Sequence, residues 1–293
     1  MEKELRKHYK SLKPMIEKLR TQKFNHRATY SLCLRATFIK AFDYNYSLNC
    51  RRSTLPAFFT IPPLRGICED IIYFRCLASW KVRERDSILR TLMLTNVFSN
   101  LKCQTKFFKT NRLFQDVLPI TPNQRRRLKR LGAKAVRLWQ RHGFNNVSSY
   151  TFSPSTRSLA RQANLLPLYD YLYHAASEFV HFNPRELLRS GWGDMKGGQM
   201  LEVRFSSENF SLYYREFAVV YGSYLLCLFV KLLARNLRIP KDVLRIVERI
   251  DAVLMAIMRW PELVTYEEMN VRPPGVIHRI FKRAMIEREG AKK

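Results

Sequence analysis

The stretch FAVVYGSYLLCLFV, residues 217–230, is the longest apolar run in the chain and decides its fold class. It carries no charged side chain and is closed by Glu216 at one end and Lys231 at the other. Its fourteen residues are too few to cross a bilayer as a helix, which takes about 20. We therefore predict a buried helix here, within a longer helical segment at Ser207–Leu237, and no membrane association.

The sequence on both sides of this run also favours helices, because apolar residues recur at intervals of three and four instead of alternating. We predict an all-α multi-helix bundle, with at most a short strand near Leu201–Phe205. The Gly-rich stretch Ser190–Gly198 is expected to be a flexible connection. The predicted helices cover residues 5–19 (with Pro14 kinking or restarting the helix), 26–46, about 64–96, 122 up to Gly143, 166–182, 207–237, 240–259 and 274–288.

These segments divide the chain into three parts that we expect to pack as one continuous domain. Residues 1–50 are N-terminal helices, residues 51–240 are a helical core, and residues 241–293 are C-terminal helices. The core contains a basic region at 101–161, interpreted as a basic helical insertion, and a histidine-containing helix at 166–182.

The composition indicates a folded protein with a strongly basic exterior. The 293 residues include 52 Lys and Arg against 24 Asp and Glu, a formal net charge of +28, and 46% of them are apolar. This excludes collagen-like, mucin-like and wholly disordered chains. Such an excess of positive charge would repel itself in a compact state unless a polyanion neutralises it. Nucleic acid, RNA or single-stranded DNA, is the expected partner, and an acidic protein is the alternative.

The cysteines and the N-terminus point to the cytoplasm. The six cysteines form no C-x-x-C pair and are interpreted as reduced thiols of the core. The N-terminus, MEKELRKHYKSLK, lacks the apolar segment and cleavage site of a secretory signal. We therefore expect a cytoplasmic protein.

Charge is concentrated in the basic region at 101–161, which holds fourteen Lys and Arg and one acid, Asp116. Thr121-Pro122-Asn123-Gln124 is a helix-capping sequence, and the helix after it is basic along one whole face. We predict that this face contacts phosphates. The interleaved aromatic residues are assigned to the core, stacking on unpaired bases being the alternative. The predicted nucleic-acid-binding residues are Arg125, Arg126, Arg127, Arg130, Lys134, Arg137 and Arg141, and the aromatic residues are Phe107, Phe108, Phe114, Trp139 and Phe144.

The stretch LYDYLYHAASEFVHFNP, residues 168–184, holds the candidate chemical site. On a regular helix its polar residues are three or four apart and share one side. A histidine there could act as acid or base, its neighbour as partner or phosphate donor, and a carboxylate could fix a tautomer. A surface or hydrogen-bonded role without catalysis is the alternative. The candidate residues are Asp170, His174, Ser177, Glu178 and His181.

A metal centre is a third interpretation of this stretch, because Glu178-x-x-His181 has the spacing used in di-iron bundles. Those bundles need a second Glu-x-x-His, and the chain has none. We therefore expect neither a metal nor a cofactor.

Two short blocks resemble a known family. Residues 173–181, YHAASEFVH, followed by Asn183 and Pro184, resemble the Tyr-Arg-x-x-Ser-x-x-Val-His signature of a bacterial helical family of unknown function. Residues 65–69, RGICE, look like that family's Arg-x-x-x-Glu helix. The signature is in turn similar to the Arg-x4-6-His motif of the HEPN superfamily, helical proteins that often act as metal-independent ribonucleases in toxin and antiphage systems. The resemblance implies a HEPN-like core.

The resemblance places His181 at the catalytic histidine and Ser177 at the polar position before it. Where the motif has its arginine, this chain has His174. An arginine would stabilise a negative phosphorane through a bidentate contact that an imidazole does not make. Two histidines can nevertheless cleave RNA by acid and base steps, so an active ribonuclease and a protein that has lost catalysis both fit.

The expected function follows from the charge and the resemblance together. The chain is interpreted as a nucleic-acid-binding effector of a bacterial antiphage defence or toxin-type system, with metal-independent RNA cleavage near His181. HEPN sites are usually shared across a dimer, which implies a homodimer. Two alternatives stay open. One is a non-catalytic basic scaffold for RNA or single-stranded DNA within a larger defence complex, and the other is an adaptor for an acidic protein.

Overall fold

The computed structural model describes residues 1–21, 28–51, 55–112, 114–149, 151–189, 191–196, 199–266 and 275. This part of the chain is mostly helical, which confirms the all-α prediction, with a single hairpin of two strands added. The helix predicted at 274–288 lies outside the described residues except for Gly275.

The elements follow one another from end to end as a series of helices interrupted by the hairpin. They are α1 (Glu2–Arg20), α2 (Thr29–Cys50), the 3-10 turn η1 (Ala57–Thr60), α3 (Pro62–Ala78), α4 (Val82–Asn111), α5 (Pro122–Arg141), α6 (Thr156–Gln162), α7 (Leu166–Leu168), the π-turn η2 (Tyr169–Tyr173), α8 (His174–Glu178), α9 (Pro184–Arg189), β1 (Gly191–Lys196), β2 (Gln199–Phe205), α10 (Ser211–Leu237) and α11 (Lys241–Met255).

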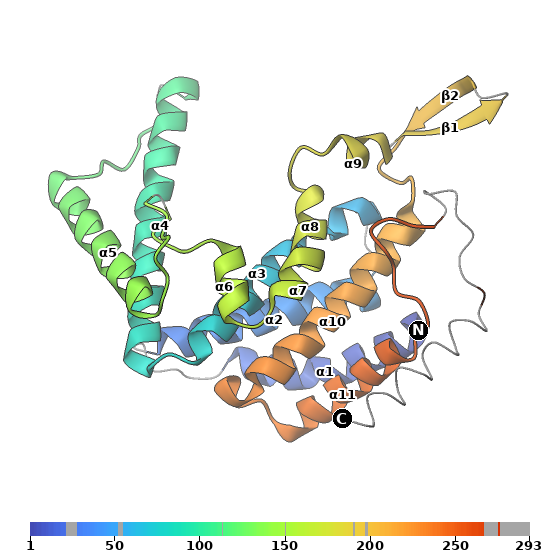
Figure 1. Cartoon of the computed structure of the whole chain (residues 1–293), viewed down its shortest axis with the longest axis horizontal. Coiled ribbons are helices and arrows are strands. Elements are labelled where there is room, and N and C mark those ends of the chain that lie inside the picture. The colour runs from blue at the N-terminus through green and yellow to red at the C-terminus, as the bar shows by residue number, and fades with distance from the viewer. Residues whose placement is uncertain are drawn as a thin grey trace.

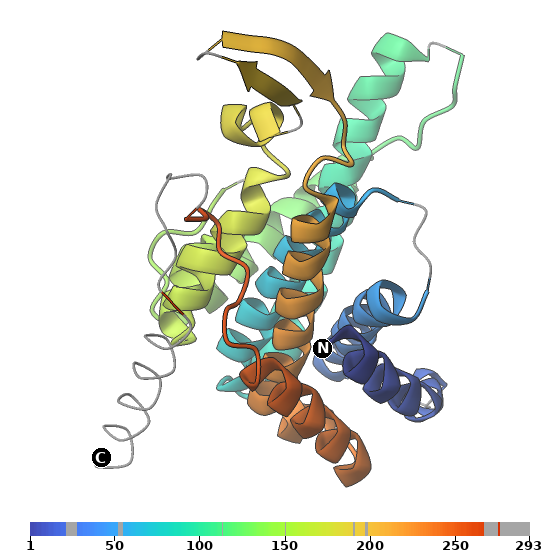
Figure 2. The same ribbon diagram turned by 90° about the vertical axis from the view of Figure 1, so that its right-hand side faces the viewer.

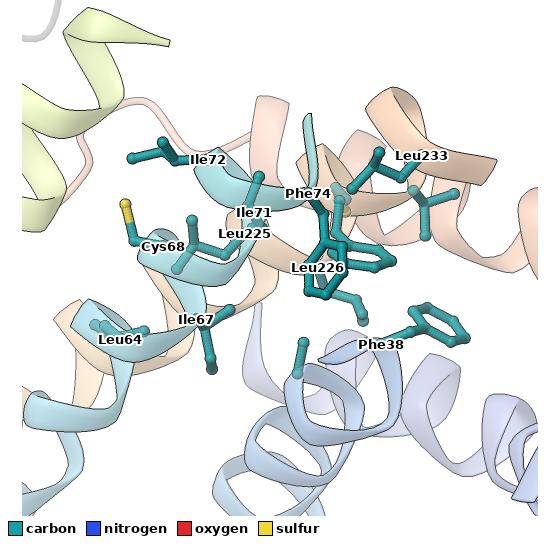
Figure 3. Close-up of a cluster of buried hydrophobic side chains, with 14 of the residues drawn as sticks. Phe38, Leu64, Ile67, Cys68, Ile71, Ile72, Phe74, Leu225, Leu226 and Leu233 are labelled. Carbon is teal, nitrogen blue, oxygen red and sulfur yellow. The ribbon is translucent and has the colours of Figure 1, made fainter. Parts of the chain in front are cut away.

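Helix α10, which contains the apolar run, forms the centre of the bundle. It packs against α2, α3, α11 and η1 (Figure 1). Figure 3 shows its Leu225 and Leu226 in one cluster with Phe38 of α2 and Ile67 and Ile71 of α3, all of them buried. By length and composition α10 could cross a membrane, but most of its apolar window is buried inside the protein. It is therefore packed as a core helix, as predicted.

Helices α2 and α10 approach most closely at Gly222, where a chain of buried polar groups joins three helices. The Asn45 side-chain amide donates to the Gly222 carbonyl oxygen (2.9 Å), and the Tyr9 hydroxyl of α1 donates to the Ser223 hydroxyl (2.9 Å). A Cβ atom at Gly222 would lie 2.7 Å from the Tyr44 ring and 2.8 Å from the Asn45 side-chain oxygen. The helices can meet here only because residue 222 has no side chain.

One predicted helix extent was wrong, and one of the two alternatives at Pro14 is excluded. The single helix expected at 64–96 is two helices, because the chain turns at Ser79-Trp80-Lys81 and buries the Trp80 ring against Trp139 and His142. Helix α1 runs through Pro14 without restarting, since Leu12 and Ile16 on either side of the proline are buried in the core.

The expected flexible connection at 190–198 is also wrong over its described residues. Gly191–Lys196 pairs antiparallel with Gln199–Phe205, with a bulge between Asp194 and Met195. Gly191 lies opposite Phe205, and a Cβ there would come within 2.8 Å of the Phe205 ring. The glycine therefore serves a close approach within a strand. The strand predicted near Leu201–Phe205 is present and is longer than expected.

Helices α4 and α5 form an arm that projects from the bundle (Figures 1 and 2). The capping box predicted at the start of α5 is confirmed, because Thr121 and Gln124 exchange hydrogen bonds of 3.2 and 2.8 Å. The inner face of α5 is held by Phe152, whose carbonyl oxygen accepts from the Trp139 indole (3.1 Å) and whose ring occupies the space of a Cβ at Gly132. Phe152 has a φ of 53°, in the left-handed region. These contacts hold α5 at its inner end.

The Gly222 contact makes a testable prediction about stability. Gly222→Ala should lower the free energy of unfolding by about 1–3 kcal/mol, because the added methyl group forces α2 and α10 apart. Gly66→Ala is the matched control, since the nearest atom to its new Cβ would be Nζ of the exposed Lys40 side chain at 3.4 Å. We expect that variant to be neutral or slightly stabilised. Urea denaturation of both proteins measures the difference, and equal midpoints would contradict the packing argument.

Candidate functional site

The segment that carries the candidate residues is not the regular helix that the sequence predicts. Residues 166–182 contain α7, the π-turn η2 and α8, which ends at Glu178. A π-turn inserts one extra residue into a helical turn and so rotates the residues beyond it by about 100°. His181 follows the helix, with its backbone amide bonded to the Ser177 carbonyl oxygen (3.0 Å). The single polar stripe expected on this helix is therefore not formed.

The five candidate residues instead make separate contacts. The Asp170 carboxylate faces Arg157 of α6 at 3.6 Å. His174 and Glu178 pair with each other at 3.4 Å, as residues four apart on a helix do. The Ser177 hydroxyl donates to the Tyr173 carbonyl oxygen of its own helix (2.7 Å). None of these contacts joins His181 to the other four candidates.

His181 is joined instead to Arg65, on the first turn of α3. Arg65 Nη1 lies 2.7 Å from His181 Nε2, and Arg65 Nη2 donates to the Tyr173 hydroxyl at 3.1 Å. The guanidinium also lies over the Tyr173 ring, 5.2 Å from its centroid. Arg65 is held there because Pro62 and Pro63 begin α3, where proline suits the first helical turn.

This contact sets the state of the His181 ring. Arginine has donors only and stays protonated in proteins, so the ring nitrogen facing it must accept. The contact as a hydrogen bond thus fits the tautomer in which Nε2 accepts and Nδ1 carries the proton. The ring is exposed to solvent, so Nε2 can be reached by an external hydroxyl once Arg65 turns to another acceptor. A neutral imidazole beside a guanidinium is a base next to an anion-binding group.

Two tyrosines and a second arginine extend this group across the surface. Tyr169 stacks on Tyr173 with ring centroids 4.7 Å apart. Burial raises the pKa of the Tyr169 hydroxyl, and the neighbouring Tyr173 hydroxyl raises it further, while Arg157 and Arg65 oppose them. Tyr169 therefore stays neutral near pH 7. On the α6 side the Thr156 hydroxyl donates to Glu69 of α3 (3.1 Å), which ties α6 to the helix of Arg65.

The sequence singles out Arg65 as part of residues 65–69, which resemble a family motif, but it does not indicate that Arg65 contacts His181. The pairing spans 116 residues and depends on how α3 packs beside η2 and α8, which residue spacing does not reveal. The structure thus brings a guanidinium, that of Arg65, to His181 from a helix distant in the sequence.

The second candidate surface is the outer face of α5 on the arm. All seven predicted phosphate-contacting residues are exposed. Within the described part of the chain, Arg141 is the only one of these seven residues with a nearby carboxylate, that of Glu84 at 3.4 Å. Lys134, Arg137 and Arg141 border a shallow pocket of about 500 Å³. The positive charge of this face is thus left open to a ligand.

The aromatic residues of the basic region divide into two groups. Trp139 and Phe144 are buried, which confirms their assignment to the core. For Phe107 and Phe114 that assignment was wrong, because they are 57% and 102% exposed at the outer end of the arm. Phe108 is half-buried. The difference arises because α4 continues beyond the body, where the described elements leave these two rings uncovered.

The surface between the arm and Arg65 is lined by polar groups. A pocket of about 480 Å³ lies where α5 ends and α6 begins, lined by Asn145, Asn146, Ser158 and Arg161 among others. The next arginine on α6, Arg157, faces Asp170 beside the tyrosine pair. Within the described ranges, no three His, Cys, Asp or Glu side chains converge to hold a metal ion.

The thiols are free in the structure, as predicted, but only three are buried. Cys68, Cys76 and Cys227 lie in the core, whereas Cys103 is exposed on α4. Burial raises the pKa of both Cys76 and Cys227 to about 12. These two thiols are therefore unreactive at neutral pH.

The Arg65 contact predicts a defined histidine tautomer. In alkaline buffer, where imidazole is neutral, nitrogen chemical shifts should show His181 protonated on Nδ1, because Nε2 accepts from Arg65. Arg65→Ala should return the ring to a mixture of both tautomers. His174, which pairs with Glu178, is the internal control and should not change. An unaltered His181 spectrum in the variant would refute the contact.

Comparison with known proteins finds a similarity over the part of the chain that holds this site. Residues 61–199 match the model of a family of unknown function (DUF5677). The match covers just under half of the chain and includes Arg65, the arm and His181. No curated protein matches. No solved structure matches either. The central segment of this chain, from α3 into the hairpin, is thus similar to a family whose function is not known.

Proposed function

We propose that this protein is an RNA-binding effector that cleaves RNA without a metal, with Arg65 and His181 as the catalytic pair. The observation that carries the proposal is the 2.7 Å contact between the Arg65 guanidinium and His181 Nε2. A HEPN-like site needs an arginine for the phosphate and a histidine for proton transfer. In this chain the arginine comes from α3 and the histidine follows α8.

The arm supports RNA as the substrate. The outer face of α5 is a row of exposed cations, and electrostatic attraction to phosphates supplies most sequence-independent binding. Arg161 and Arg157 continue positive charge along α6 towards Tyr169 and Tyr173. An RNA backbone bound to α5 would therefore lie beside Arg65 and His181, and no further element of the protein would be needed to guide it there.

The proposed reaction uses the 2′-hydroxyl of the RNA as the nucleophile. The phosphate displaces Arg65 from His181, so the guanidinium contacts two phosphate oxygens and Nε2 becomes free. Nε2 takes the proton of the 2′-hydroxyl while its oxygen attacks phosphorus. The bond to the 5′-oxygen breaks, that oxygen takes a proton from water, and the resulting hydroxide is neutralised by the proton that His181 releases. The products are a 2′,3′-cyclic phosphate and a 5′-hydroxyl end.

The proposal extends to the setting that the family resemblance implies. We place the protein in the bacterial cytoplasm, as the effector of an antiphage defence or toxin-type system. HEPN-like sites act there on cellular or phage RNA, and a homodimer would bring two such sites together.

A non-catalytic scaffold is the second candidate function, and one contact favours it. His174, at the motif's arginine position, forms an ordinary pair with Glu178 and is exposed. The basic face of α5 would suffice to hold RNA or single-stranded DNA within a larger complex. An adaptor for an acidic protein needs the same face, but its binding would survive nuclease treatment.

The catalytic pair is tested by separating cleavage from binding. His181→Ala and Arg65→Ala should each lower the cleavage rate about 10²-fold or more, because each removes one of the two groups that act on the phosphate. RNA affinity should stay within about twofold, since the arm holds the backbone. His8→Ala, on α1 at the far side of the bundle, is the control and should behave as wild type. Binding without cleavage in the wild-type protein would favour the scaffold.

The role of the α5 face is tested by the salt dependence of affinity. Changing Arg130, Lys134 and Arg137 together to Gln should flatten the slope of log affinity against log salt by about 0.7 for each lost phosphate contact. Arg215, which pairs with Glu2 on the opposite part of the bundle, provides the control change to Gln. The same slope in both proteins would exclude α5 as the phosphate-binding surface.

Purification from the host without nuclease identifies the partner. We expect the protein to carry RNA, visible as a raised ratio of absorbance at 260 to 280 nm and identified by sequencing. Co-purified single-stranded DNA would support the scaffold, and an acidic protein retained after nuclease treatment would support the adaptor.

A further inference from the structure

The outer end of the arm presents two phenylalanine rings to solvent. Phe107 lies in the last turns of α4, and Phe114 lies just beyond its end. Their exposures of 57% and 102% leave most or all of each ring uncovered. Full exposure of such a ring forgoes the hydrophobic stabilisation that burial would contribute. A ring left in this state is available to a ligand.

The rings lie among cations and amides. Lys102, Lys106, Lys109 and Arg112 are all exposed around them, and Asp116 is the one acid within residues 101–121. A pocket of about 460 Å³ at this end is lined by Thr110, Asn111, Arg112, Phe114 and Gln115. It thus combines an aromatic face, hydrogen-bonding amides and a guanidinium.

This combination matches the chemistry of an unpaired nucleotide. A base can stack on an aromatic ring, its polar edge can bond to amides, and its phosphate can contact a guanidinium. A duplex keeps its bases stacked on each other and offers only phosphates and grooves. The rings therefore discriminate between single and double strands, which the phosphate contacts of α5 do not.

We infer that the arm tip, residues 106–112 and 114–116, is a second nucleic-acid-binding site, at which Phe107 and Phe114 stack on unpaired bases of single-stranded RNA. The inference rests on the proposed RNA binding by the α5 face and narrows its substrate to RNA with single-stranded segments. In this arrangement the arm tip binds bases and α5 binds the phosphate backbone.

The test compares single and double strands on the full-length protein. Two proteins are compared, the wild type and a variant with Phe107 and Phe114 both changed to Ala. Fluorescence anisotropy measures the affinity of each for a labelled single-stranded oligo(A) RNA and for a blunt RNA duplex of equal length. We expect the single-strand affinity to fall about 10-fold or more and the duplex affinity to change less than about twofold. The salt slope should stay the same, because no cation is removed.

Two further variants sharpen the comparison. Changing Leu212 to Ala, at a residue 83% exposed far from the arm, controls for the loss of exposed apolar surface and should leave both affinities unchanged. Changing the two phenylalanines to Tyr retains the aromatic faces and should retain single-strand affinity. Circular dichroism checks that α4 remains helical in every variant.

The outcomes separate this inference from the proposed function. If the wild-type protein binds neither RNA, the proposed function and the arm-tip site both fail. If it binds RNA through α5 but the Phe-to-Ala variant keeps full single-strand affinity, only the arm-tip site fails. Equal losses for both RNAs would also overturn it. If the Phe-to-Ala variant retains RNA affinity but loses self-association, the rings would be assigned to contact with a second copy. If it retains RNA affinity but loses binding to vesicles of equal parts phosphatidylcholine and phosphatidylserine, they would be assigned to a membrane.

Discussion

The structure depends on the close contact between α10 and α2 at Gly222. Helix α10 is apolar on nearly all sides and must be covered, yet the contact also buries hydroxyl and amide groups of Tyr9, Asn45 and Ser223. These groups bond to one another and to the Gly222 backbone, so their burial leaves few unmet hydrogen bonds. With α2 fixed on one side of α10, α3 takes the next position around it, and α3 carries Arg65.

The Arg65–His181 contact depends on elements that are held from elsewhere, α3 for Arg65 and α8, which His181 follows. α3 packs against α10 in the core, while η2 and α8 pack against α3. Tyr171 of η2 and Tyr221 of α10 both bond to the Pro261 carbonyl oxygen, so the segment after α11 also fastens η2 to the central helix. The π-turn brings Tyr173 towards Arg65 and lets the chain leave α8 with His181 beside the guanidinium. A site assembled this way keeps its geometry while its surface stays open to a polymer.

In the proposed function the two candidate surfaces would divide the work of handling RNA. The charge on α5, whose inner end is anchored through Phe152 and Trp139, would attract and hold the backbone. Cleavage would take place on the body, where Arg65 and His181 lie. The arm itself reaches beyond the bundle and carries its aromatic residues where they can meet bases. Because the polar pocket at the α5–α6 junction lies between them, a bound strand would follow protein surface from arm to pair.

Sequence by itself determined the helical class, the buried central helix, the capped start of α5 and its cationic face, because each depends on residues close together in the chain. Tertiary structure alone decided three things. The chain turns after α3 because the Trp80 ring packs against Trp139 and His142, and Phe107 is exposed because none of the described elements covers it on the outer part of α4. Arg65 meets His181 because α3 and α8 pack together. Spacing along one helix indicates which side chains share a face, but a contact between helices depends on the packing of the whole core, which local pattern does not encode.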